Sequence, residues 1–401
     1  MEAMAVARIN GKMISWALRR SGASLDSLAS KKLTLQKLAA WVSGEEFPSE
    51  GQAEDLADRL GIAYPMLFMP TVPPDEPIKI PDLRTLDGRS LRNPSSGLLE
   101  VLDSTRARQK WFREQMEEAG LDPLPFVGKF SLASDPSSVA DDMRDALMID
   151  ALRTHESSDY EAFLKTLITR SESLGILVMR SAVVGHASRR PLSVKEFRGF
   201  AFPDDLAPVV FINDSDAKAA QIFTLAHEIA HVWIGAPGIS GRAPNEEGNS
   251  LNTVERFCDS AAAEFLAPER EFRSLWKPSH PLDRNMFGAS RHFNVSTLVA
   301  LRRARDLRLL TLSEFFAKVN EQYDAYRRRE REKLKKESQQ KEGKKKSGNF
   351  WNSFEIRNGR TFNATVVKAL REQRATYAEA GSLLGINPGA ASRYMQRMSA
   401  G

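Results

Sequence analysis

Two histidines and a glutamate in one short segment carry the strongest chemical signal of the chain. Residues 221–235, QIFTLAHEIAHVWIG, contain the HExxH pattern His227-Glu228-Ile229-Ala230-His231. On a helix, positions i and i+4 share a face, so both imidazoles can reach one Zn²⁺ at about 2.0–2.1 Å. Glu228 can then accept a proton from the attacking water and pass it to a leaving amine. The pattern predicts a hydrolytic metal site.

The flanks of this pattern distinguish a metal site from a chance match, which is the alternative for so short a motif. The neighbouring residues are mostly apolar, which predicts a buried helix. Burying two imidazoles and a carboxylate without partners costs free energy, and a bound cation removes that cost. The flanks therefore favour the metal site.

A second segment offers the third ligand that catalytic zinc usually has. Residues 252–268, NTVERFCDSAAAEFLAP, predict an amphipathic helix on which Glu255 and Asp259 share a face. We interpret Glu255 as the third ligand and Asp259 as the acceptor of the outer N–H of an imidazole, that of His227. Glu264 is the alternative third ligand, and either glutamate could instead be a plain surface carboxylate. Cys258 is either a ligand or, as its apolar setting favours, a packed thiol.

The remaining chemistry of the site stays open at this level. His280, His292 or a tyrosine could polarise a substrate carbonyl, and nothing in the sequence chooses among them. Two histidines and a glutamate suit zinc by ligand type, and Mn²⁺ is the alternative ion.

Length and composition set the frame for this site. A chain of 401 residues predicts two or three domains, and its 42 % hydrophobic and 27 % charged residues are ordinary for a globular protein. The single cysteine excludes an internal disulfide and a cysteine-based zinc finger. We find no apolar run long enough for a membrane span and no secretory signal, and expect a cytoplasmic protein.

The net charge of +5 is a local feature. Residues 327–346 hold eleven Lys or Arg against four Glu, a net +7, so the rest of the chain is slightly acidic. This basic run could attract nucleic acid. The alternative is a solvated helix end that runs into a linker.

The order of the predicted elements gives a mostly α chain with a small β-sheet, an α+β fold. Strands are expected within 176–185, 197–202 and 208–213, and helices elsewhere. The expected parts are a helical bundle at 1–70, a Pro-rich linker at 71–96, a zincin-like domain at 97–320, the basic segment at 321–348 and a small helical module at 349–401.

Residues 176–310 resemble the ImmA/IrrE family of metallopeptidases. The resemblance rests on FRGFAF, PVVFIN, the HExxH helix and VERFCDSAAAEFLAP, in this order and spacing. It implies zinc ligands at His227, His231 and Glu255, while Asp259 replaces the Asn usual in that segment. Many family members cleave a partner DNA-binding repressor or antitoxin and so switch on a stress, mobile-element or defence response, and the resemblance implies such a role here.

The N-terminal segment resembles an XRE-type helix-turn-helix domain, with a second helix at about 24–32 and a recognition helix at about 34–43. This resemblance implies that Gln36 and Lys37 contact bases or phosphates and that Arg19, Arg20, Lys31 and Lys32 contact phosphates. The expected recognition helix has few base-reading side chains, so the domain could instead bind a related protein.

The C-terminal module is similar to the tail of such fusions, and YAEAGSLLGINPGAASRYM resembles a second helix-turn-helix unit. Scaffolding, substrate docking and dimerisation are all open roles for it.

The sequence as a whole favours a zinc endopeptidase that cuts a repressor or antitoxin. The alternative is a helix-turn-helix regulator or antitoxin in which the metallopeptidase fold senses or scaffolds. A hydrolase of small molecules is a third interpretation, for which no binding motif is evident.

Overall fold

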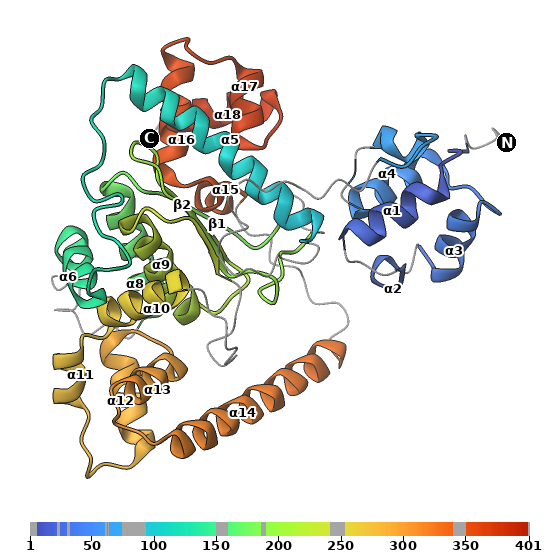
Figure 1. Ribbon diagram of the computed structural model, residues 1–401. Helices are drawn as coiled ribbons and strands as arrows, with labels where there is room; N and C mark the ends of the chain where they lie inside the picture. The colour runs from blue at the N-terminus through green and yellow to red at the C-terminus, as the bar shows by residue number, and fades with distance from the viewer. Residues whose placement is uncertain are drawn as a thin grey trace. The chain divides into compact units, whose positions relative to one another are not determined.

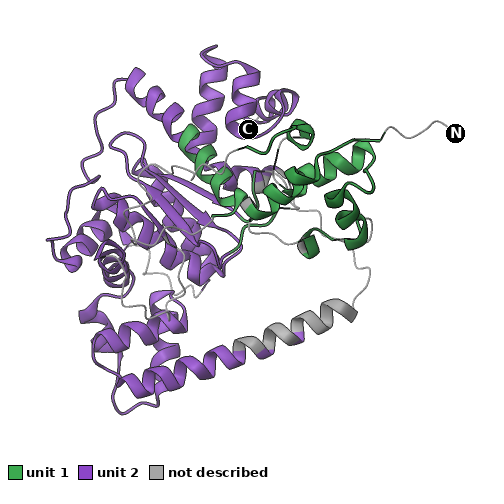
Figure 2. Ribbon diagram, turned by 45° about the vertical axis from the view of Figure 1, so that its right-hand side comes forward, with its two compact units in different colours: residues 1–108, 182–193 green, residues 109–181, 194–401 purple. Residues whose placement is uncertain are grey.

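The computed structural model describes ten stretches of the chain that form two compact units (Figure 2). The described residues are 6–21, 25–29, 33–60, 62, 64–73, 94–149, 159–185, 190–240, 253–339 and 350–399. Unit 1 holds residues 1–108 and 182–193, and unit 2 holds residues 109–181 and 194–401. Among the described residues, no helix has the length and apolar character that a membrane crossing requires.

The N-terminal part of unit 1 is a small helical bundle. Its elements are α1 (Gly11–Ser21), α2 (Leu25–Leu28), α3 (Leu35–Ser43), α4 (Glu50–Leu60) and the 3₁₀ helix η1 (Tyr64–Phe68). Thr34 caps α3 by accepting a hydrogen bond from the Lys37 amide, and Gly44 ends this helix in a left-handed conformation. Trp16, Trp41 and Leu56 lie in its core.

A four-stranded mixed sheet forms the centre of unit 2. It consists of β1 (Leu177–Ser181), β2 (Gly199–Phe202), β3 (Val209–Asn213) and β4 (Gly238–Ser240), in the order β1-β3-β2-β4. β1 and β3 are parallel, whereas β2 is antiparallel to both β3 and β4. Every residue of β1, β2 and β3 is buried, which explains why apolar residues follow one another in these strands without alternation, up to Arg180-Ser181 at the end of β1 and Asn213 at the end of β3.

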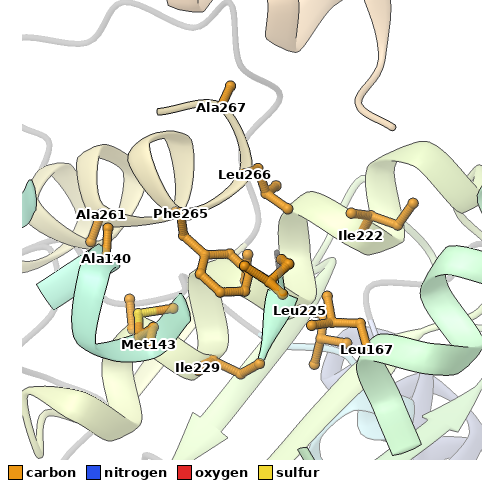
Figure 3. Packing of buried hydrophobic residues seen from close by; sticks show 14 of the residues in the cluster. Ala140, Met143, Leu167, Ile222, Leu225, Ile229, Ala261, Phe265, Leu266 and Ala267 are labelled. Carbon is orange, nitrogen blue, oxygen red and sulfur yellow. The ribbon is translucent and has the colours of Figure 1, made fainter. Parts of the chain in front are cut away.

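A group of four helices lies beside the sheet, and one of them, α9 (Lys218–Trp233), carries the HExxH segment. α9 packs against β2 and β3, and it is flanked by α8 (Tyr160–Ser173), α10 (Thr253–Leu266) and α6 (Pro136–Leu147) (Figure 1). Phe265 of α10 points toward Leu225 and Ile229 of α9 (Figure 3). The small side chains of Ala140 and Ala261 lie side by side where α6 meets α10 (Figure 3). The core therefore fixes α10 against α9.

Further helices follow in the chain. α11 (Glu269–Leu275), α12 (Leu282–Phe293), α13 (Thr297–Asp306) and the long α14 (Leu312–Gln339) lead away from α10. α12, α13 and α14 pack on one another in sequence. The first part of the basic run is therefore helical, and residues 340–346 lie outside the described residues.

The C-terminal module joins the same compact unit as the sheet. Its helices are α15 (Phe350–Asn358), α16 (Arg360–Arg371), α17 (Tyr377–Leu384) and α18 (Pro388–Ser399). α15 lies along β1, and the Phe362 ring meets the Trp111 ring of α5 (Ser96–Glu118) edge to face at 5.8 Å. Glu172 Oε1 accepts a 2.8 Å hydrogen bond from the Arg360 amide, so α8 caps α16.

The expected fold class is confirmed: the chain is mostly helical with one small sheet. β1, β2 and β3 fall within the three predicted strand segments. β4 was not predicted, because three residues give no readable alternation. Lys31 and Lys32 lie outside the described residues, whereas Gln36 and Lys37 are exposed on α3.

Candidate metal centre

The HExxH residues lie on one continuous buried helix, α9. His227 and His231 are one turn apart, and their Nε2 atoms are 3.1 Å from each other. Both imidazoles and Glu228 are at most 3 % exposed. The four-residue spacing of the two histidines therefore places their rings side by side, as the sequence predicted.

Glu255 from the first turn of α10 completes a group of three. Its Oε2 lies 3.2 Å from His227 Nε2, and its Oε1 lies 3.3 Å from His231 Nε2. Ligands of a tetrahedral zinc ion at about 2.0–2.1 Å are about 3.3 Å from one another. The two imidazoles and this carboxylate are the group of described side chains best placed to hold a metal ion.

The outer nitrogens of both rings are held by acceptors. His227 Nδ1 is 3.0 Å from Asp259 Oδ1, and His231 Nδ1 is 2.9 Å from the Ala236 carbonyl oxygen. A carboxylate and a carbonyl only accept hydrogen bonds, so each Nδ1 carries the proton. In the neutral rings, the Nε2 atom of each histidine then directs its lone pair toward the space between the two rings and Glu255. Such a donor set fits a divalent cation.

A turn after α9 brings the backbone back over His231. Gly235 has φ +64°, a left-handed conformation that suits glycine, and Ala236 follows with its carbonyl at the ring. Gly238 then enters β4 beside the ring, where an added Cβ would lie 2.5 Å from His231 Nε2 and 2.8 Å from Nδ1. Only glycine leaves room for the imidazole.

A second glycine makes room beside Glu228. A Cβ on Gly199 of β2 would lie 2.6 Å from Thr224 Cγ2, 2.8 Å from the Phe211 carbonyl oxygen and 3.1 Å from Glu228 Oε1. The Glu228 carboxylate therefore lies directly against the β2 backbone. This contact limits where the carboxylate can move.

The carboxylates favour positive charge at this point. Burial alone would lower the pKa of His227, but hydrogen bonds to Asp259 and Glu255 outweigh it and hold that pKa well above its ordinary value. Burial would raise the pKa of Glu255, but contacts with His227 and His231 outweigh it and hold that pKa far below its ordinary value. Both shifts point to a cluster that attracts a cation.

The two alternative metal ligands, Glu264 and Cys258, do not join the cluster. Glu264 forms an ion pair with Arg303 and accepts a hydrogen bond from the Glu269 amide, so its carboxylate is engaged outside the cluster. Cys258 is fully buried in the core, and burial raises the pKa of its thiol well above the ordinary value, as a packed thiol requires.

The histidines considered for carbonyl polarisation are not part of the cluster. His292 contacts Glu271 Oε1 at 2.6 Å, and His280 lies in the loop before α12. His155 and His186 lie outside the described residues.

Residues 172–305 match the family model Peptidase_M78, described as the IrrE N-terminal-like domain. This segment is similar to the IrrE N-terminal-like domain. The match spans β1 to α13 and so includes the whole histidine–glutamate cluster. It supports a metallopeptidase of the ImmA/IrrE type. No curated protein matches the chain.

Several contacts around the histidine–glutamate cluster were not predicted from the sequence. Arg302 of α13 lies with Nη2 3.4 Å from Asp259 Oδ2, on the oxygen opposite the one that meets His227. The roles of the Ala236 carbonyl, Gly199 and Gly238 were also not predicted. The run Gly235-Ala236-Pro237-Gly238 directly after the helix was the available signal for a tight turn.

Proposed function

We propose that the chain is a zinc-dependent endopeptidase that cleaves a specific partner protein, a DNA-binding repressor or an antitoxin. The observation that carries the proposal is the pair of inward-facing Nε2 atoms joined by Glu255, with each outer nitrogen held by an acceptor. The family match supports the peptidase part of it.

Each residue has a defined part in this proposal. His227, His231 and Glu255 would hold the zinc ion, and Asp259 would fix the ring of His227. Zinc at such a site polarises a carbonyl and lowers the pKa of water toward about 7. Glu228 takes the proton of the attacking water and delivers it to the leaving amine. The absence of a side chain at Gly199 leaves room for this carboxylate.

Metal analysis of the purified full chain tests the site. We expect one zinc per chain in the wild type and a loss of zinc in His231→Ala and Glu255→Ala. Glu264→Gln is the matched control on the same helix and should keep the metal. A wild-type protein that takes up neither zinc nor manganese would contradict the proposal.

Cleavage is tested in cells that express either the wild type or Glu228→Gln. Mass spectrometry of protein N-termini should reveal a new terminus in a repressor or antitoxin only with the wild type. Glu228→Gln should retain its zinc. Equal cleavage by both proteins would rule out Glu228 as the base.

A helix-turn-helix regulator or antitoxin is the second candidate function. The exposure of Gln36 and Lys37 on α3 supports it, since both side chains are open to a partner. In that case the wild type would bind an operator or partner protein and leave every protein N-terminus unchanged. The double variant Gln36→Ala/Lys37→Ala would then lose that binding.

A further inference from the structure

The last two described helices, α17 and α18, are joined in the way that is typical of a helix-turn-helix. α17 ends at Leu384 and α18 begins at Pro388, so Gly385, Ile386 and Asn387 form a three-residue turn. Helix-turn-helix units join their helices by three or four residues that often include glycine. α17 and α18 pack closely on each other, and both contact α16.

Each residue of the turn has a conformation or a hydrogen bond that stabilises the turn. Gly385 has φ +72°, and the Ile386 amide donates to the Gly381 carbonyl at 2.8 Å, which ends α17. Asn387 Oδ1 accepts a 2.8 Å hydrogen bond from the Ala390 amide and so caps α18, with Pro388 at its first position. At the other end of the unit, Thr376 caps α17.

Gly381 allows the two helices to approach. A Cβ at this position would lie 2.7 Å from the Ile386 carbonyl oxygen and 3.3 Å from the Pro388 nitrogen. The inner face of α18 is fixed by Ala391 and Tyr394, and the Tyr394 ring stacks on Trp351 at 5.3 Å. The turn and this core determine which face of α18 points outward.

That outward face is polar and basic. Gly389, Arg393, Gln396 and Arg397 are exposed on it, and α18 contains no acidic residue. Among the described residues, no carboxylate forms an ion pair with either arginine. Residues 350–399 hold seven Lys or Arg against three Glu, a net +4. A phosphate backbone has the complementary charge.

The N-terminal bundle differs in this respect. Residues 1–73 hold eight basic and eight acidic residues, a net charge of zero. Its α3 exposes Leu35 beside Gln36 and Lys37, and α4 contributes four acidic side chains. Charge therefore favours the C-terminal pair as the surface for a polyanion.

We propose that α17–α18 is a DNA-binding helix-turn-helix whose α18 enters the major groove of double-stranded DNA. Arg and Gln are the side chains that read guanine and adenine edges there, so Arg393 and Gln396 contact bases. Arg397, one turn after Arg393 on the same face, contacts phosphate. The C-terminal module and the IrrE-like segment at 172–305 belong to one compact unit. DNA binding by α18 would therefore hold the proposed peptidase at that DNA.

The first test uses the full chain and a labelled random-sequence duplex DNA, measured by fluorescence anisotropy as salt rises from about 50 to about 200 mM. We expect binding that weakens steeply with salt. Arg393→Ala/Arg397→Ala should make the slope of log affinity against log salt shallower by about one, because Arg397 is the phosphate contact of the pair. Arg284→Ala/Arg291→Ala, which removes two exposed arginines of α12, is the charge-matched control and should leave the slope unchanged.

The second test separates base reading from charge. A preferred sequence is selected from a randomised duplex pool with the wild type. Arg393→Lys should keep the affinity for random duplex but lose about 5- to 150-fold of the preference for the selected sequence, because lysine lacks the bidentate fork. Zinc content, which this surface does not touch, reports that each variant is folded.

Three outcomes would overturn the proposal. One is the absence of duplex binding at about 50 mM salt. Another is wild-type affinity and preference in Arg393→Ala/Gln396→Ala, with binding lost in Gln36→Ala/Lys37→Ala instead. The third is a preference for single-stranded RNA over the duplex.

Discussion

The metal cluster and the α17–α18 pair belong to one compact unit, yet they present their polar groups in opposite ways. In the cluster, His227, His231 and Glu228 are buried, and each imidazole is fixed from behind. In the pair, Arg393 and Gln396 stand exposed on a helix whose inner face is fixed by packing. Buried polar side chains need a bound partner to offset the loss of water around them, whereas exposed polar side chains keep their water.

This difference determines what a substitution should change. A change in the cluster should alter metal binding and, through it, the stability of the fold. A change on the exposed face of α18 should alter DNA binding and leave the metal in place. Substitutions in each region therefore separate the two functions.

Removal of the metal should have the largest effect on stability. A ligand that binds only the folded state at about 1,000 times its dissociation constant stabilises it by about 4 kcal/mol. We expect a chelator to lower the melting temperature of the wild type and added zinc to restore it. His227→Ala should melt at the same temperature with and without zinc, while Arg393→Ala should respond as the wild type does. A zinc response in His227→Ala would contradict the assignment of the ligands.

Gly238→Ala should come next. The added Cβ would lie 2.5 Å from His231 Nε2 with the imidazole in its present place, so the ring or β4 must shift. We expect a loss of about 1–3 kcal/mol in the free energy of unfolding, together with weaker zinc binding.

Gly288→Ala is the matched control, since Gly288 lies within α12 and an added Cβ meets nothing within 4 Å. Its stability should be unchanged or slightly higher, because alanine favours the helix. Equal zinc affinity in both variants would show that β4 can move away from the ring without consequence.

Much of the cluster could be predicted from the sequence because helical spacing encodes it. His227 and His231 are four residues apart, as are Glu255 and Asp259, so each pair had to share a helix face. The Ala236 carbonyl, Gly199 and Gly238 could not be predicted in the same way. They reach the site through a left-handed turn and through strand pairing, which leave no periodic signal.

The fold, too, could be predicted only in part from the sequence. The strands of the sheet core were readable as short apolar runs, and the C-terminal module as mostly helical. The packing of the C-terminal helices on the sheet was not readable. It depends on contacts such as Trp111 with Phe362 and Glu172 with the Arg360 amide, between residues more than 180 positions apart.

Asp259→Asn should weaken zinc binding without abolishing it. Asp259 does not belong to the three inward-facing ligands, but it accepts the outer N–H of His227 and contacts Arg302. Loss of such a supporting carboxylate lowers metal affinity by about 10- to 100-fold. Competition with a zinc-binding dye measures the change. Glu264→Gln, which removes a carboxylate from the same helix outside the cluster, should stay at wild-type affinity.

Gly381→Ala should have the smallest effect on the metal cluster, and it tests the exposed α17–α18 pair. An added Cβ would lie 2.7 Å from the Ile386 carbonyl oxygen and would push the turn between α17 and α18 outward. Because this contact is with the backbone, the turn itself must shift, and we expect a loss of about 1–3 kcal/mol in the free energy of unfolding. The tilt of α18 should change with the turn, so duplex binding should weaken more than stability does. Zinc content should stay at the wild-type level, since the cluster is held by α9, α10 and β4. A variant that loses zinc but keeps duplex affinity would mean that the C-terminal helices support the peptidase core and do not form a separate binding surface.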